Sequence, residues 1–157
     1  MKLGKCLVVG VFATVGLVLA GDQPKSAYPT REPEGVAKGM LAGGNESCQN
    51  AVARGLSWLA ERQEDEGSWK FEGEQKPDVI QTTGLALLPF LGARQTHLEE
   101  KSAKYHKTVA AGVKFLLEQQ RANGTFQGAA SVRSHSLATL ALCELYGMTR
   151  DKKLLIA

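Results

Sequence analysis

The chain has 157 residues, a formal net charge of +3 and a hydrophobic fraction of 43%. This length leaves room for one domain. Two of the positive charges are Lys2 and Lys5, so the rest of the chain carries about +1 (3 minus 2), which excludes the strongly basic surface typical of nucleic-acid binding.

The N-terminal segment has the composition of a secretory signal peptide. Lys2 and Lys5 precede an apolar run over residues 7–20, and Val18 and Ala20 suit the −3 and −1 positions of a cleavage site. The run is shorter than the roughly 20 residues that a membrane span needs. We therefore expect export to the periplasm, the cell surface or the medium after cleavage. The alternative is anchoring by the uncleaved segment, which would be the only membrane contact.

A flexible linker and a first helix are predicted next. Residues 21–45 are rich in Gly, Pro, Lys and Glu and show no apolar period. A helix is predicted over residues 47–62, with Asn45 or Ser47 as its N-cap. One apolar stripe follows helical spacing, made of Val52, Leu56, Leu59 and Gln63. This pattern predicts an amphipathic helix with one face in water.

A second helix, of a different kind, is predicted over residues 79–91. Pro77 and Asp78 suit its start. It has almost no polar side, which predicts burial on all sides. We expect Pro89 to bend or end this helix and Gly92 to close it.

The whole pattern recurs once further along the chain. Gly55, Trp58, Leu59, Gln63, Gly67 and Trp69 correspond, at one constant spacing, to Gly112, Phe115, Leu116, Gln120, Gly124 and Phe126. An amphipathic helix over residues 104–119 and an apolar helix over residues 134–146 complete the second unit. We interpret residues 46–150 as two αα-hairpin repeats, 46–92 and 104–147, followed by a connector, 151–157, that leads toward a third repeat.

The first repeat resembles a known motif. The order Arg54-Gly55-x-x-Trp58-Leu59-x-x-x-Gln63-x-x-x-Gly67-x-Trp69 is similar to the QW repeat of squalene and oxidosqualene cyclases, a hairpin that also builds the β-subunits of protein prenyltransferases. Residues 134–149 resemble the inner helix of exported bacterial, planctomycete-like prenyltransferase/squalene-oxidase repeat proteins. The resemblance covers about residues 48–150. It implies an all-α fold of αα-hairpin repeats from an α/α toroid, here part of an (α/α)6 barrel.

The resemblance also implies roles for four side chains. Gln63 with Trp69, and Gln120 with Phe126, would be structural clasps between repeats. In the family, the Gln amide reaches backbone groups of a neighbouring outer helix and the aromatic ring stacks on that amide. The alternative is that these four are ordinary surface and core residues.

Catalytic signatures are missing from the sequence. It has no DxDD motif of triterpene cyclases, no zinc set of prenyltransferases, no GCGEQ thioester, no Ser-His-Asp constellation and no phosphate loop. Residues 64–66, all acidic, read as a solvated turn. His135 and Cys143 lie two helical turns apart, too far for one metal ion. We predict no catalytic residue, metal or cofactor in these residues and leave enzymatic activity open.

Polar side chains on the apolar helices are the remaining site candidates. Gln81, Thr82, His135 and Glu144 could line a cavity at one mouth of a helical barrel. The alternative is that Thr82 and Ser134 bond to the backbone and that His135 is a satisfied core histidine. Glu144 would need a partner, for which Arg133 and Arg150 are candidates.

Two further histidines, and the two cysteines outside the predicted signal segment, are the last candidates. His97 and His106 fall in the polar connector and are expected at the surface. Cys48 and Cys143 could pair in an exported protein, but Cys143 lies in an apolar run, which favours unpaired thiols.

Three functions are compatible with the sequence. The first is an exported repeat protein, non-catalytic in these residues, that binds an apolar small molecule or a protein. The second is the N-terminal fragment of a terpenoid-cyclase-like or prenyltransferase-like enzyme whose catalytic residues lie beyond residue 157. The third is an α/α toroid of the cell surface that acts on polysaccharide or peptide. If two repeats are the whole product, self-association would cover their open apolar ends.

Overall fold

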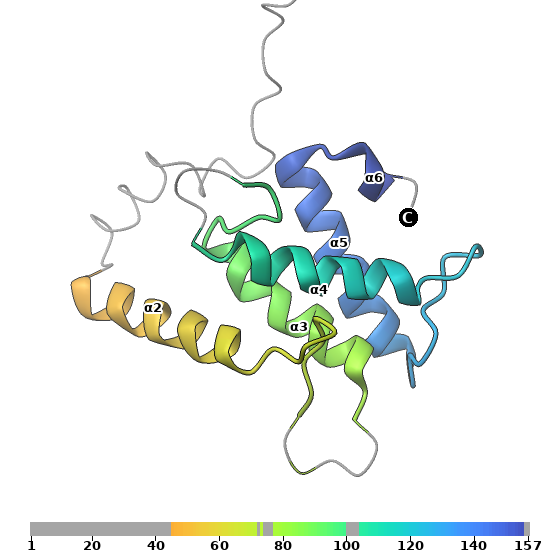
Figure 1. The fold of residues 1–157 in the computed structure, drawn as a ribbon, viewed down its shortest axis with the longest axis horizontal. Coiled ribbons are helices and arrows are strands. Elements are labelled where there is room, and N and C mark those ends of the chain that lie inside the picture. The colour runs from red at the N-terminus through yellow and green to blue at the C-terminus, as the bar shows by residue number, and fades with distance from the viewer. Residues whose placement is uncertain (1–44, 72, 74–76, 100–103, 156–157) are drawn as a thin grey trace, which may run out of the picture.

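The computed structural model describes residues 45–71, 73, 77–99 and 104–155, and this part of the chain is all-helical (Figure 1). The helices are α2 (Glu46–Glu61), α3 (Val79–Gly92), α4 (His106–Gln119), α5 (Val132–Thr149) and α6 (Lys152–Leu155). The predicted signal segment, 1–20, and nearly all of the predicted linker, 21–45, lie outside these residues.

Helix α2 lies at one edge of the molecule (Figure 1). Asn45 is its N-cap, because the Asn45 side chain accepts a hydrogen bond from the Cys48 backbone N–H at 2.9 Å. The only buried residue of α2 is Leu56. Its predicted amphipathic stripe therefore has little to pack on, and most of the helix is in contact with solvent.

Helices α3 and α5 form the most extensive contact in the structure. Their backbones approach closely at Gly84, where a Cβ atom would lie 2.7 Å from the Ala138 backbone nitrogen. Only a residue without a side chain fits at this crossing. Helix α4 runs in front of both helices in Figure 1 and packs on α3.

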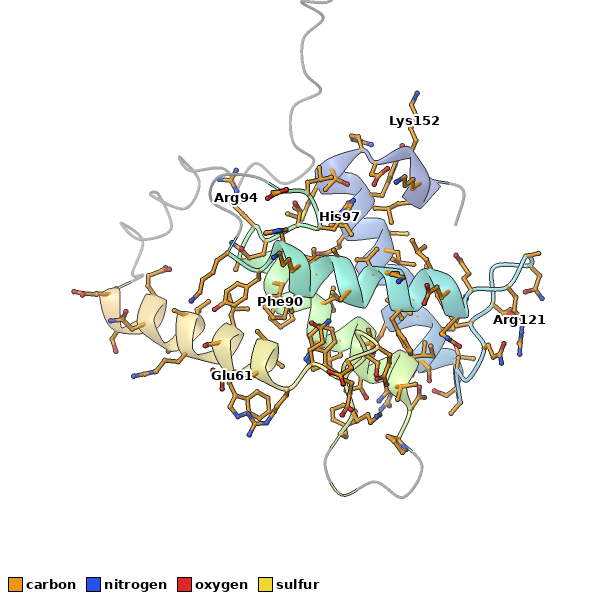
Figure 2. The ribbon with its side chains drawn as sticks, viewed as in Figure 1. Glu61, Phe90, Arg94, His97, Arg121 and Lys152 are labelled. Atoms are coloured by element: carbon orange, nitrogen blue, oxygen red, sulfur yellow. The ribbon has the colours of Figure 1, made fainter. Side chains whose placement is uncertain are left out.

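One hydrophobic core lies among α3, α4 and α5. Its largest fully buried apolar side chains are Ile80, Leu87, Phe90, Leu91, Val109, Leu116 and Leu145. Figure 2 shows Phe90 where α3 passes behind α4. The Phe90 ring contacts the rings of Trp69 and Tyr105, with centroids 6.2 and 5.3 Å away.

The structure corrects one expectation about the apolar helices. Pro89 lies inside α3 without ending it, and the helix closes at Gly92, as predicted. Neither apolar helix is buried on all sides, because α3 exposes Leu85 and α5 exposes Leu140. An apolar composition alone did not indicate which face lacks a neighbour. Helix α5 is also longer than predicted, and Ser131 is its N-cap in a capping box with Ser134.

The predicted connector after α5 contains the short helix α6. Leu154 of α6 is buried, and α6 contacts α5. Within the described residues, this segment therefore folds back onto α5.

Candidate functional site

Gln63 joins the end of α2 to the start of α4. Its side-chain Nε2 donates to the backbone carbonyl of Thr108, in the first turn of α4, and to that of Gly67, each at 2.9 Å. A primary amide has two N–H donors. Both are therefore used on backbone oxygens, one in the turn after α2 and one in α4.

Trp69 also connects the end of α2 to α4. Its indole N–H donates to the Leu59 carbonyl at 2.8 Å, and its backbone N–H donates to the Thr83 hydroxyl at 3.1 Å. Leu59 lies in the last turn of α2, where carbonyls lack full helical partners. The buried Trp69 ring packs on α4, because a Cβ atom at Gly112 would lie 2.9 Å from it.

The turn between Gln63 and Trp69 requires glycine. Gly67 has φ of +94°, and a Cβ atom there would collide with the Ala111 carbonyl oxygen of α4. The turn is held by two backbone bonds, from Glu64 N–H to the Ser68 carbonyl at 2.9 Å and from Gly67 N–H to the Glu64 carbonyl at 2.8 Å. This geometry brings the chain against α4 without a gap.

The same backbone turn recurs after α4. Arg121 N–H donates to the Thr125 carbonyl and Gly124 N–H donates to the Arg121 carbonyl, both at 2.8 Å. Gly124 also has positive φ, +80°, but a Cβ atom there would meet nothing within 4 Å. The second turn thus has the conformation of the first without a helix packed against it.

The second Gln and aromatic pair differs in its contacts. Gln120 and Phe126 form an isolated antiparallel backbone bridge, and Phe126 is buried. Within the described residues, the Gln120 side chain makes no hydrogen bond. The pair borders a groove of about 250 Å³, the tail groove, lined by Gln120, Phe126, Thr139, Leu142, Cys143, Tyr146 and Leu154.

A larger apolar groove lies between α2 and α3. This α2–α3 groove has a volume of about 640 Å³ and is lined by Trp58, Leu59, Arg62, Trp69, Lys70, Phe71, Thr82, Leu85, Ala86, Leu88 and Pro89. Large apolar side chains stand open to solvent along it. Trp58 is 52% exposed and Leu85 is 43% exposed.

Two cations border the α2–α3 groove, and both have partners. The Arg62 guanidinium lies over the Trp58 ring, 3.9 Å from its centroid. The Lys70 ammonium pairs with Glu64 at 3.2 Å and with Glu66 at 3.6 Å. Hydrogen bonds from its own backbone and from Ser68, together with the Lys70 charge, hold the pKa of Glu66 below its ordinary value. The groove therefore offers apolar contact rather than uncompensated charge.

A polar junction connects the starts of α3 and α5. The Asp78 carboxylate caps α3 by accepting from the Gln81 N–H at 3.0 Å, and it also accepts a hydrogen bond from the Ser134 hydroxyl. The cap was predicted from the sequence. The second bond was not, because a helix cap looks the same in sequence whether or not its other oxygen reaches a neighbouring helix.

His97 and Asp151 connect the segments that follow α3 and α5. Their side chains meet at 2.8 Å, and both are largely buried. Figure 2 shows His97 beside the end of α5. The expectation that His97 is an ordinary surface residue was wrong, because the segment after α3 folds against the segment after α5. Hydrogen bonds from the Lys153 backbone N–H and from His97 lower the pKa of Asp151.

The four predicted cavity residues do not share one groove. Thr82 lines the α2–α3 groove, and its hydroxyl donates to the Asp78 carbonyl at 2.9 Å. Gln81, His135 and Glu144 are half-buried and line neither groove. The His135 ring lies 5.4 Å from the Phe126 ring, and its Nδ1 is buried without a hydrogen-bond partner among the described residues.

The described residues do not assemble a centre for metal chemistry. No three His, Cys, Asp or Glu side chains converge there in a geometry that could hold a metal ion. Cys48 and Cys143 are both free thiols and both exposed, although the apolar run around Cys143 suggested a core position. None of the described helices is long and apolar enough to cross a lipid bilayer.

The chain was compared with protein-family models, with curated proteins and with solved structures, and none of the three comparisons gives a match.

Proposed function

We propose that the chain is an exported, non-catalytic helical repeat protein that binds an apolar partner in the α2–α3 groove. The observation that carries the proposal is the groove itself. A volume of about 640 Å³ lined mainly by apolar side chains, with Trp58 and Leu85 exposed, is of the size and character of a binding site.

The repeat part of the proposal is supported by paired geometry. The turns that follow α2 and α4 have the same backbone bonds, and each contains a glycine of positive φ. Two stacked αα-hairpins of an α/α toroid would produce this pairing. The toroid would place α2 and α4 in an outer layer and α3 and α5 in an inner layer.

The polar side chains around the groove are engaged within the protein. Arg62 and Lys70 both have partners, and the Thr82 hydroxyl donates to the Asp78 carbonyl. Binding through apolar contact needs none of these groups.

The test is the binding of a neutral apolar dye, Nile red, to the full chain and to two variants. Trp58→Ser removes an exposed wall of the groove and should weaken dye binding at least fivefold, because a large aromatic contact is lost. Val132→Ser removes another exposed apolar side chain, 83% exposed, outside the groove and should leave binding unchanged. Equal loss in both variants, or no dye binding by the wild type, would contradict the proposal.

A further inference from the structure

The exposed face of α2 has a covered counterpart on α4. The two helices carry the same residue pattern, one in each hairpin. Val109 and Phe115 of α4 are 0% and 9% exposed, whereas Val52 and Trp58, their counterparts on α2, are 51% and 52% exposed. Since the side chains are alike in kind, the difference lies in what packs against each helix.

The structure shows what covers the α4 face. Trp69 and Leu87 of the first hairpin close over Gly112, because a Cβ atom at Gly112 would lie 2.9 and 3.0 Å from their side chains. Gln63 adds a hydrogen bond to the Thr108 carbonyl one turn earlier. The cover is therefore a set of three: an amide, an aromatic ring and a leucine of the preceding hairpin's apolar helix.

The same set of three lines a groove at the other end of the molecule. Gln120, Phe126 and Leu142 border the tail groove, where Gln120 is half-buried and Phe126 and Leu142 are 3% and 6% exposed. In the second hairpin they occupy the places that Gln63, Trp69 and Leu87 occupy in the first. Leu154 of α6 lines the same groove without filling it. The described residues thus place the covering set beside a groove at one end and an exposed α2 face at the other.

Gly55 is the second observation that points to a docked partner. It lies in the interior of α2, is exposed, and a Cβ atom there would meet nothing within 4 Å. Glycine weakens a helix relative to alanine. At its counterpart Gly112, the Trp69 and Leu87 side chains pack where a Cβ atom would lie. Glycine at position 55 would leave the same space for an aromatic ring and a leucine of a partner.

We infer that the partner of the exposed α2 face is a second copy of this chain, whose tail groove docks on it head to tail. In this arrangement Phe126 and Leu142 of one copy pack over Gly55 of the next, and Gln120 donates to the Ala51 carbonyl as Gln63 does to that of Thr108. The inference rests on the proposed function, because the exposed α2 face shares Trp58 with the α2–α3 groove and the second copy would be its apolar partner.

The docked copies should meet less closely than the two hairpins of one chain. Thr139 has the place in α5 that Gly84 has in α3, and Gly84 is where α3 and α5 approach most closely. The larger Thr139 side chain keeps the copies further apart, so association is expected to be reversible.

The test uses two single variants of the full chain and their mixture, followed by sedimentation equilibrium. Gly55→Glu blocks the α2 face, and Thr139→Glu blocks the tail groove. Both sites are exposed, so both variants should fold, which circular dichroism would verify. The wild type should form concentration-dependent oligomers, and each variant alone should weaken association at least tenfold. An equal mixture should form one-to-one dimers, because each variant retains the surface that the other lacks.

Different results would separate the two proposals. If the wild type is monomeric at every concentration, or if the mixture stays monomeric, the head-to-tail inference is wrong. Nile red binding that is lost in Trp58→Ser would in that case still support an apolar partner of another kind. A symmetric interface between two α2 faces would show itself by association of Thr139→Glu alone, which would also overturn the inference.

Discussion

The side-chain Nε2 of Gln63 lies 2.9 Å from the backbone oxygen of Thr108, and this bond connects two helices that are distant in sequence. The bond lies beside the Trp69 ring and the Gly67 turn. The amide, the ring and the glycine therefore all belong to one contact between the end of α2 and α4. Gln120, which occupies the same place in the pattern, makes no side-chain hydrogen bond within the described residues.

Replacing Gln63 should therefore cost more than replacing Gln120. Gln63→Ala removes two hydrogen bonds to backbone oxygens and should lower the free energy of unfolding by about 1–3 kcal/mol. Gln120→Ala, the matched control, should change it by less than about 0.5 kcal/mol. Urea denaturation of both variants checks this, and equal losses would mean that the Thr108 bond contributes nothing measurable.

The two turn glycines offer a second matched pair. Gly67→Ala and Gly124→Ala both place a side chain at positive φ, which costs about 1–2 kcal/mol. At Gly67 the new Cβ also meets the Ala111 carbonyl, and overpacking adds about 1–3 kcal/mol. In thermal unfolding, the midpoint temperature of Gly67→Ala should therefore be well below that of Gly124→Ala. The opposite order would contradict the close approach of the turn to α4.

Trp69 should not be replaceable by phenylalanine without loss, although its counterpart is Phe126. Trp69→Phe keeps a ring but removes the indole donor to the Leu59 carbonyl, at a cost of about 1–2 kcal/mol. Trp58→Phe changes an exposed ring and should be neutral within about 0.5 kcal/mol. Chemical denaturation followed by circular dichroism measures the free energy of unfolding of both variants. An unchanged value for Trp69→Phe would contradict the role given to the indole N–H.

Asp151 should make stability depend on acid pH. Its pKa is lower in the folded chain than in the unfolded chain, so the unfolded state binds a proton first as the pH falls. The stabilisation is present above the ordinary carboxyl value of about 3.9 and is lost as the pH falls through the lower folded value. Asp151→Asn should therefore lose less stability than the wild type between neutral pH and about pH 3.

The measurement for Asp151 is urea denaturation across that pH range. Glu66, whose pKa is also lowered, gives a background loss common to both proteins. His97→Asn removes one of the two hydrogen bonds to Asp151 and should reduce the effect without abolishing it, because the Lys153 backbone bond remains. Identical pH profiles for wild type and Asp151→Asn would exclude this contribution.

The helices were predictable because their apolar periods are strong. The amphipathic pattern around Leu56 and the apolar run around Leu87 each predicted a helix of the right type, with limits that differ by a few residues. Pro89 lies near the last turn of α3 without ending it, and the helix closes at Gly92, as the sequence predicted.

Burial was harder to predict than helix type, since it depends on neighbours. Val52 and Val109 have the same place in the pattern and opposite exposure. Contacts between distant segments, such as His97 with Asp151 and Asp78 with Ser134, have no local signal in a single sequence. The α2–α3 groove was not predicted for the same reason, although Thr82, one of its lining residues, had been singled out.

Backbone amide exchange in α2, measured at low and high protein concentration with α4 as the internal reference, tests the central claim most directly. We predict that protection rises with concentration around Gly55 and Trp58 while α4, which is already covered by Trp69 and Leu87, stays unchanged. An exchange pattern in α2 that is independent of concentration would contradict docking of a second copy on its exposed face.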